Sequence, residues 1–225
     1  MLAQLASRFT WLIQMIVKPK RTNSNISAVK QNLLKRKESP MLLPTKYAIT
    51  CNEKSLDELA QLLVLHGADS SCQVRAKSYS LSSLKQAIGS YVKGIVLVNS
   101  ASYDGSDVAP FHGVHLTSKD LSDKALIQSV RHSGAQYLAA SCHNEQEIEL
   151  ANKAGCDFIT ISPVEATSSH PDATPIGWQR FAELSKLANM PTFALGGQCT
   201  HNVEHAQSYG AHGVAGISGF WKVEK

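Results

Sequence analysis

The chain has 225 residues, 43% of them apolar, which is enough to bury the core of one domain. It contains no run of eighteen apolar residues, so a membrane-spanning helix is not expected. Five cysteines without a CxxC pair fit neither a zinc site nor a disulfide framework. Reduced thiols make the cytoplasm the expected location.

The positive charge belongs to the beginning of the chain. The net charge is +4, but residues 1–37 hold eight Lys or Arg and no acid, and acidic side chains outnumber basic ones beyond them. Because the remainder is mildly acidic, nucleic acid is not an expected partner. Apolar residues recur at helical spacing, which predicts a short amphipathic basic helix: Leu2, Leu5, Phe9, Leu12 and Ile16. Such a segment is interpreted as a targeting segment, a membrane-surface arm, the product of a misassigned start codon or, equally, a poorly ordered extension.

From Lys46 onward, short β-branched apolar runs alternate with segments of helical period. We therefore divide the chain into an extension, residues 1–45, and a domain, residues 46–225. Eight strands are predicted in this domain: Tyr47–Thr50, Ser71–Arg75, Gly94–Val98, Gly113–Leu116, Gln136–Ser141, Phe158–Ser162, Thr192–Leu195 and Gly213–Ile217.

Capping residues mark the ends of several helices between these strands. Ser55 is placed to cap a helix over Leu56–His66, with Gly67 as its stop. Asn144 is placed to cap Glu145–Ala154, which Gly155 ends, and Thr200 or Asn202 can open a helix that ends at Gly210. The segment between strands three and four is too short for a full helix.

Alternating strands and helices indicate an α/β fold of parallel β/α units. Eight such units closing on themselves give a single (β/α)8 TIM barrel, here with an N-terminal basic extension; an open doubly wound sheet is the alternative. In a barrel, functional residues follow the C-terminal ends of the strands. This placement directs the search for a site.

Glycine-rich turns follow strands seven and eight. Gly196-Gly197 comes after strand seven, and Ile217-Ser218 is followed by Gly219 after strand eight. Glycines let backbone N–H groups approach an anion, and helix starts after them would add positive ends. Because these two loops are the usual phosphate site of barrels, we expect phosphate binding here rather than a mere tight turn.

Strand two ends in alternating polar residues. Gln73, Arg75 and Lys77 fall on one side of the strand. Two cations pointing into a barrel need an anionic partner, and a diphosphate suits a guanidinium fork beside a point charge.

Candidate reactive groups follow strands four and five. Asp120 is either a helix cap or a ligand for Mg²⁺, which prefers hard oxygen donors. His143 is a candidate acid/base, because histidine exchanges protons near neutral pH, and Ser141 is a candidate hydrogen-bond donor.

These motifs together resemble the thiamine phosphate synthase and thiazole tautomerase (TenI) family. The resemblance runs from about Tyr47 to Trp221 and includes the segments GVHL, SCHN, SPV and ALGG. It is closest to the synthase-like domains fused to Nudix hydrolases, although this chain shows no Nudix box. The family is a TIM barrel that joins hydroxymethylpyrimidine diphosphate to hydroxyethylthiazole phosphate and releases pyrophosphate.

The resemblance implies a role for each matched residue. Gln73, Arg75, Lys77 and Asn99 would hold the pyrimidine and its diphosphate, with Asp120 as the magnesium ligand. Ser141 matches the serine that assists pyrophosphate departure, and His143 matches the acid/base of the tautomerase. The residues implied for the thiazole phosphate are Thr167, Gly196, Gly197, Ile217 and Ser218.

Two positions depart from the family pattern. Asn99-Ser100 replaces the usual Asn-Asp, so one magnesium carboxylate is missing and Mg²⁺ becomes an uncertain cofactor. His170 stands where the family places a lysine on the diphosphate. A protonated histidine is a weaker, pH-dependent substitute for that cation, and Asp104 and Asp107 are candidate substitutes for the carboxylate.

Three functions remain open. The first is a thiamine phosphate synthase acting on small phosphorylated pyrimidine and thiazole ligands. The second is a metal-independent, TenI-like thiazole tautomerase. The third is a module that binds thiazole or thiamine phosphate without turnover, and any of the three is compatible with an oligomer.

Overall fold

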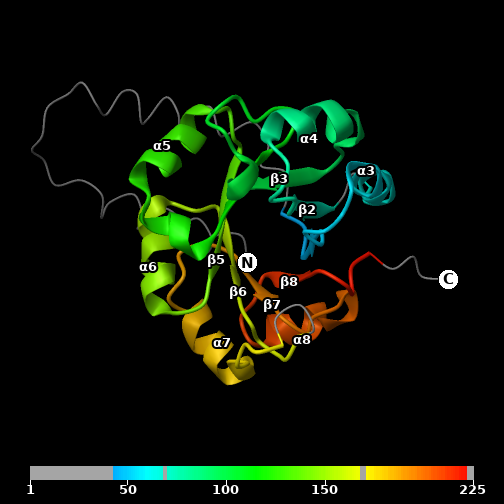
Figure 1. Ribbon diagram of the computed structural model, residues 1–225. Helices are drawn as coiled ribbons and strands as arrows, with labels where there is room; N and C mark the ends of the chain where they lie inside the picture. Colours follow the sequence, from blue (N-terminus) through cyan, green and yellow to red (C-terminus); the bar gives the residue numbers. More distant parts are fainter. Residues whose placement is uncertain (1–42, 68–69, 168–170, 222–225) are drawn as a thin grey trace, which may run out of the picture. The chain divides into compact units, whose positions relative to one another are not determined.

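The protein folds as a closed barrel of eight parallel strands (Figure 1). The structure is a computed structural model that describes residues 43–67, 70–167 and 171–221. Each strand pairs with its neighbours in chain order, and β8 pairs with β1. The strands are β1 Lys46–Ile49, β2 Ser71–Val74, β3 Ile95–Asn99, β4 Gly113–Leu116, β5 Tyr137–Cys142, β6 Phe158–Ile161, β7 Thr192–Leu195 and β8 Gly213–Gly216. The predicted (β/α)8 barrel is confirmed.

Helices surround the strands, as Figure 1 shows. The α-helices are α3 Leu56–Leu65, α4 Leu81–Ile88, α5 Lys124–His132, α6 Glu145–Ala154, α7 Gly177–Ser185 and α8 Val203–Ser208. Short 3-10 turns are η1 Gly89–Tyr91, η2 Ser100–Ser102, η3 Ser118–Ser122 and η4 Thr200–Asn202. Only η2 lies between β3 and β4, as the sequence predicts.

The capping signals at Ser55 and Asn144 act as the sequence indicates, whereas neither Thr200 nor Asn202 forms a side-chain cap at the start of α8. Ser55 forms a capping box with Glu58 at the start of α3. The Asn144 side chain accepts from the Glu147 amide at the start of α6, and Gly155 ends that helix with φ of 66°. Beyond β7 the chain first forms the turn η4, so α8 begins only at Val203.

The strand pleat divides the core into two layers. One layer fills the barrel: Tyr47, Ile49, Ile95, Leu97, Ala139, Phe158, Phe193 and Ala215. The alternate residues, such as Val96, Val114 and Leu138, pack against the helices. Each large side chain that is fully buried contributes roughly 1.5–3 kcal/mol of transfer free energy. Because both faces of the sheet are buried, the strand register is firmly set.

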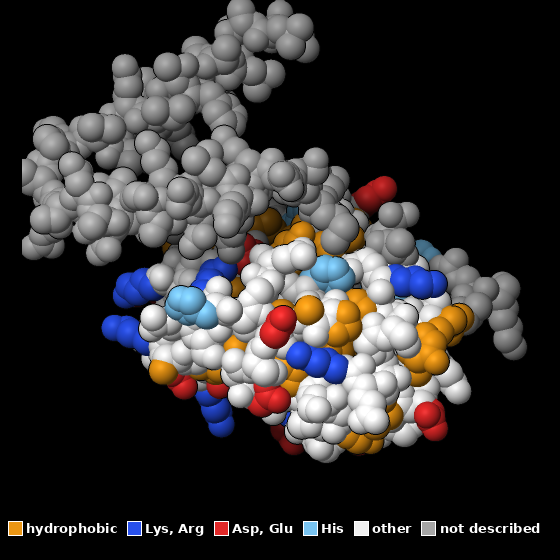
Figure 2. All heavy atoms as spheres, turned by 90° about the horizontal axis from the view of Figure 1, so that it is seen from above, with side chains coloured by type: hydrophobic (Ala, Val, Ile, Leu, Met, Phe, Trp, Pro, Cys, Tyr) orange, Lys and Arg blue, Asp and Glu red, His pale blue; other side chains and the backbone are white. Residues whose placement is uncertain are grey.

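The surface carries charges of both signs. Figure 2 shows one face of the molecule, on which basic, acidic and histidine side chains are scattered among apolar ones. Within the described residues, no helix has both the length and the hydropathy needed to cross a membrane. All five cysteines are free thiols.

Candidate functional site

A cavity of about 1060 Å³ is formed by residues that follow the C-terminal ends of the strands. Because pockets for single ligands usually measure about 300–1,000 Å³, this cavity has room for two small ligands. The predicted site residues that line it are Gln73, Arg75, Lys77, Asn99, Ser141, His143, Thr167, Gly196, Gly197, Ile217 and Ser218. These residues lie in or directly after six different strands, which barrel closure brings together.

The polar residues of the β2 segment lie on the cavity side, as their alternation predicts. Gln73 is 3% exposed, while Arg75 is half-buried and Lys77 is exposed. The backbone here is fixed by two bonds from the segment after β1, because Arg75 N donates to Thr50 Oγ1 over 2.8 Å and Lys77 N donates to Asn52 Oδ1 over 3.0 Å. Neither cation forms an ion pair within the described residues. Both positive charges are therefore available to an anion in the cavity.

The glycine turn after β7 requires glycine at both positions. Gly196 and Gly197 have φ of 100° and 70°. A Cβ on Gly196 would lie 2.9 Å from Pro163 Cα, and one on Gly197 would lie 2.7 Å from Glu165 Cβ. The turn is thus packed tightly against the segment after β6.

Hydrogen bonds from Glu165 join these two segments further. Its carboxylate accepts from Trp178 Nε1 over 3.0 Å and from Gln198 Nε2 over 3.2 Å. The Glu165 amide also donates to Gly196 O over 3.2 Å. Because Gln198 Nε2 donates to Gly196 O as well, the turn has little freedom to change shape.

The turn after β8 differs from the expectation in one respect. Ile217 and Ser218 do line the cavity, but the described residues from Ile217 to Trp221 form a turn and no helix. Any anion there is approached by turn amides rather than by a helix end. Beyond β7 the nearest regular element is the three-residue η4.

The ring of His143 is oriented by a backbone carbonyl. Its Nδ1 lies 2.8 Å from Ser162 O, and a carbonyl oxygen can only accept, so Nδ1 carries the proton. In the neutral ring, Nε2 is then left with its lone pair. Because His143 lines the cavity and is exposed, that nitrogen can accept a proton from a ligand.

Ser141 lies deeper, at the wall of the cavity. Its Oγ is 3.0 Å from His115 Nε2 and 3.4 Å from Thr160 Oγ1. The neighbouring Cys142 faces the outer layer instead, and burial raises the pKa of its thiol well above the usual range. That thiol is therefore not a nucleophile for the cavity.

Asp120 belongs to the capping box that Thr117 forms at the start of η3, whereas the helix that follows, α5, is capped by Asp123. Its Oδ2 accepts from Thr117 N, from Thr117 Oγ1 and from Ser100 Oγ over 2.8, 2.6 and 2.6 Å. Burial alone would raise the pKa of this carboxyl, but the bonds from Ser100 and Thr117 outweigh it and lower the pKa. Asp120 does not line the cavity.

The residues at this corner do not fit a magnesium ion held by two carboxylates. Ser100 is in hydrogen bond contact with the carboxylate where a second one would be needed. No group of three His, Cys, Asp or Glu side chains suited to a metal occurs in residues 43–67, 70–167 and 171–221. The suggested substitutes are also engaged elsewhere, since Asp104 accepts from Ser106 and Asp107 accepts from the Ala109 amide.

The loop after β6 contains two predicted ligand contacts, Thr167 and His170. Thr167 lines the cavity. His170 lies outside the described residues, so its predicted contact with a diphosphate stays a prediction.

The cavity also contains a cation that the sequence analysis did not select. Lys119 is exposed and lines the cavity beside Thr117 and Ser118. The signal for it was present, because Lys119 follows strand four at the functional end of the barrel.

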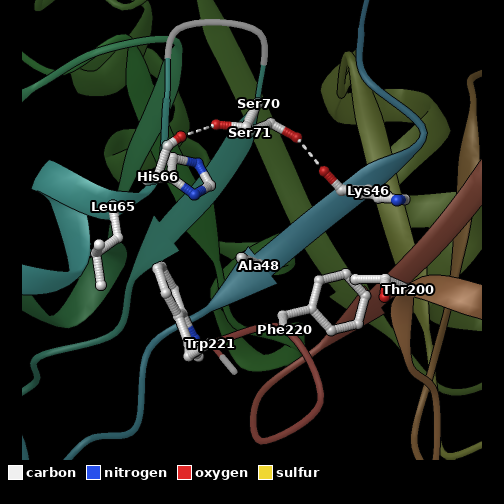
Figure 3. A pocket seen from close by; sticks show the side chains of 9 residues that line it. All are labelled: Lys46, Ala48, Leu65, His66, Ser70, Ser71, Thr200, Phe220 and Trp221. Carbon is white, nitrogen blue, oxygen red and sulfur yellow. Dashed lines mark hydrogen bonds between the residues drawn. The ribbon is translucent and has the colours of Figure 1, made fainter. Parts of the chain in front are cut away.

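A smaller cavity, of about 360 Å³, lies on the flank of the barrel. Figure 3 shows Trp221 and Phe220 on one side of it and His66, Ser70 and Ser71 on the other. None of the predicted site residues lines this cavity. We therefore assign the ligand site to the large cavity at the strand ends.

A closed barrel of eight parallel strands with helices between them places the chain in the class of (β/α)8 TIM barrels. Comparison with known families narrows this class. The model of the family described as thiamine monophosphate synthase matches residues 46–220. The chain belongs to this family, and it is a transferase of thiamine biosynthesis with thiamine phosphate synthase-like activity.

Relatives from distant organisms agree with this family. A protein of Aquifex aeolicus, named as a candidate second thiamine-phosphate synthase, is 32% identical over 80% of this chain and 99% of its own length. A thiamine-phosphate synthase of Prochlorococcus marinus is 27% identical over 86% of this chain, which spans 56% of that longer protein. Thiamine phosphate pyrophosphorylase from Pyrococcus furiosus shares the fold, with a TM-score of 0.58, 22% identity and coverage of 77% of this chain and 85% of its own.

Proposed function

We propose that the large cavity joins hydroxymethylpyrimidine diphosphate to hydroxyethylthiazole phosphate and releases pyrophosphate. One observation carries the proposal: a single cavity is lined both by the cations after β2 and by the glycine turns after β7 and β8. The reaction needs two anionic groups bound at once, with their reacting carbons close together. Two separate groups of residues suited to anions, lining one cavity, meet that need.

The diphosphate is proposed to bind on the β2 side. Arg75 offers a planar fork that suits phosphate oxygens, and Lys77 adds a point charge. Gln73 and Asn99 are buried and line the cavity, and their amides suit the edge of a pyrimidine. His170 is proposed to act as an additional cation when protonated. Lys119 offers a permanent positive charge on the same cavity wall.

The thiazole phosphate is proposed to bind at the glycine turns that follow β7 and β8. Backbone amides of Gly196, Gly197 and Ser218 would donate to its oxygens, with the Thr167 hydroxyl beside them. The Glu165 bonds hold this turn in one shape before any ligand arrives. Such preorganisation reduces the entropy cost of binding.

Departure of pyrophosphate requires neutralisation of the negative charge that develops on the leaving oxygens. Arg75, Lys77, Lys119 and the Ser141 hydroxyl line the space where that charge would form. Fixed donors in a partly enclosed site typically supply several kcal/mol of such stabilisation. The Ser100–Asp120 corner does not fit a metal held by two carboxylates. The test of the proposed reaction therefore compares turnover with and without Mg²⁺.

The test is direct incubation of the purified chain with both substrates, once with Mg²⁺ and once with a chelator. Formation of thiamine phosphate and pyrophosphate in the ratio of one to one is the expected result. If a folded protein, shown by cooperative melting, gives no turnover either with Mg²⁺ or with the chelator, the proposal is rejected.

A second candidate is the metal-independent tautomerase. The observation that favours it is the His143 ring, whose Nδ1 is bound to Ser162 O so that Nε2 can accept a proton in the cavity. Aromatisation of the tautomeric thiazole phosphate should then occur with a chelator present and be lost in His143→Ala. If His143→Ala retains that activity, this candidate is eliminated.

Further attributes of the chain are part of the proposal. We propose that residues 46–225 form the barrel domain, that residues 1–45 form a separate extension, and that the protein acts in the cytoplasm. Small phosphorylated ligands are its proposed partners. Size-exclusion chromatography with light scattering measures the oligomeric state directly.

A further inference from the structure

His115 lies inside the barrel, beneath the wall of the large cavity. It is on β4, is 1% exposed and is surrounded by aromatic rings, with Tyr47 at 5.7 Å and Phe158 at 6.4 Å between centroids. It does not line the cavity itself. A buried polar ring in an apolar core needs hydrogen bonds to offset its desolvation.

Both ring nitrogens have partners. Tyr47 Oη lies 3.1 Å from Nδ1, and Ser141 Oγ lies 3.0 Å from Nε2. Burial lowers the pKa of His115 to about 3, so the ring is neutral and holds one proton. Two tautomers are possible, and each gives Ser141 a different role.

The buried phenol decides between them. Tyr47 is 0% exposed, and burial raises its pKa well above the usual range, so it keeps its proton. In the described part of the chain, the hydrogen bond of its hydroxyl is the one to His115. If Nδ1 carried the ring proton, it would donate to the phenol oxygen, and the buried phenol proton would lack an acceptor.

It follows that Tyr47 donates to Nδ1 and that Nε2 carries the ring proton toward Ser141. Thr160 Oγ1 also approaches Ser141 Oγ, at the longer distance of 3.4 Å. Both contacts direct donors at the lone pairs of the serine oxygen. The Ser141 hydroxyl proton is then free to point only away from them, toward the cavity.

We propose that His115 is a positioning residue, which, through its Nε2–H, holds the Ser141 hydroxyl as a donor toward an anionic oxygen of the ligand. This inference rests on the proposed function, because it assigns the anion to the departing diphosphate. In the opposite tautomer, the Ser141 hydroxyl would donate its hydrogen bond to Nε2. The lone pairs of the serine oxygen would then face that anion. The Ser141 hydroxyl therefore attracts the leaving oxygens of the diphosphate in the first tautomer and repels them in the second.

The tautomer is measurable without any turnover. Long-range ¹H–¹⁵N correlation of the histidine side chains distinguishes a protonated from an unprotonated ring nitrogen, and His115→Gln identifies the His115 signals by their loss. Protonated Nε2 with unprotonated Nδ1 is expected in the ligand-free protein. Protonated Nδ1 overturns the inference, whatever the enzyme does.

Kinetics test the positioning role with a matched pair. Gln and Met are similar in length, but only Gln offers an N–H near the position of Nε2. His115→Gln should retain kcat within about threefold of the parent, whereas His115→Met should lose about ten- to hundredfold in kcat with little change in KM. A purely structural role predicts equal losses for both variants.

A double-mutant cycle completes the test. If His115 acts through Ser141, His115→Met adds no further loss of kcat to Ser141→Ala. Losses that multiply overturn the inference. Absence of turnover in the parent would instead refute the proposed function, and the tautomer measurement would still decide whether His115 directs the serine.

Discussion

Ser100 Oγ donates a hydrogen bond to Asp120 Oδ2 over 2.6 Å, across twenty residues of sequence. The contact joins the end of β3 to the start of η3. The resemblance to the synthases implies an aspartate at position 100 as a second magnesium ligand, and this chain has a serine there. Here the carboxylate is satisfied by protein donors instead of by a cation.

Replacement of Ser100 by Asp should create the missing magnesium site. Without metal, two carboxylates would face each other and the hydrogen bond would be lost, so we expect the free energy of unfolding to fall by about 1–3 kcal/mol. Mg²⁺ should then raise the melting temperature of Ser100→Asp more than that of the parent. Ser100→Ala, which loses the bond without adding charge, is the control and should not respond to Mg²⁺. Equal responses of all three proteins would contradict this account of the corner.

Neutralisation of Arg75 should weaken diphosphate binding. Because Arg75 lines the cavity without an ion-pair partner in the described residues, we expect Arg75→Gln to raise the dissociation constant of pyrophosphate about ten- to hundredfold in calorimetry. Lys153→Gln is the matched control, since it removes the same charge from an exposed pair with Glu149 on α6. Similar losses of pyrophosphate affinity in both variants would mean that the net charge of the protein, and not the Arg75 guanidinium, attracts the anion.

Local signals explain how far the sequence predicts the fold. The strands and the caps at Ser55 and Asn144 depend on residues only a few positions apart, so they can be read directly. The strand ends shift by about one residue, as at β3, which includes Asn99. Such shifts are within the usual uncertainty of element boundaries.

The site is less accessible to sequence reasoning, because its contacts join distant segments. Thr117, three residues before Asp120, was a readable signal for a capping box. The alternation of β4 places His115 inside the barrel, but nothing local reveals Tyr47, which lies sixty-eight residues earlier.

Gly197→Ala should damage both stability and phosphate binding. The added Cβ would meet Glu165 at 2.7 Å in a residue with φ of 70°, so we expect a loss of about 1–3 kcal/mol in the free energy of unfolding. Gly67→Ala separates the two causes, because its φ is 62° and no atom lies within 4 Å of the new Cβ. It should cost less stability and leave thiazole phosphate affinity unchanged. If the two variants lose equally, steric packing of the turn against Glu165 is not what demands glycine.

His115 should also make the protein sensitive to acid. Its pKa is lowered to about 3 by burial, whereas an unfolded histidine titrates near 6.5. Between these values the unfolded chain binds a proton that the native protein does not, so stability is complete above about pH 6.5 and falls as the pH decreases, by up to about 1.4 kcal/mol per pH unit. Urea unfolding of the parent and of His115→Gln should give parallel curves above pH 7, with a steeper decline of the parent toward pH 4.5. His66, whose pKa burial lowers to about 4, is present in both proteins and cancels in the comparison. If the free energies of unfolding of the two proteins stay parallel down to pH 4.5, His115 is not held neutral in the native barrel.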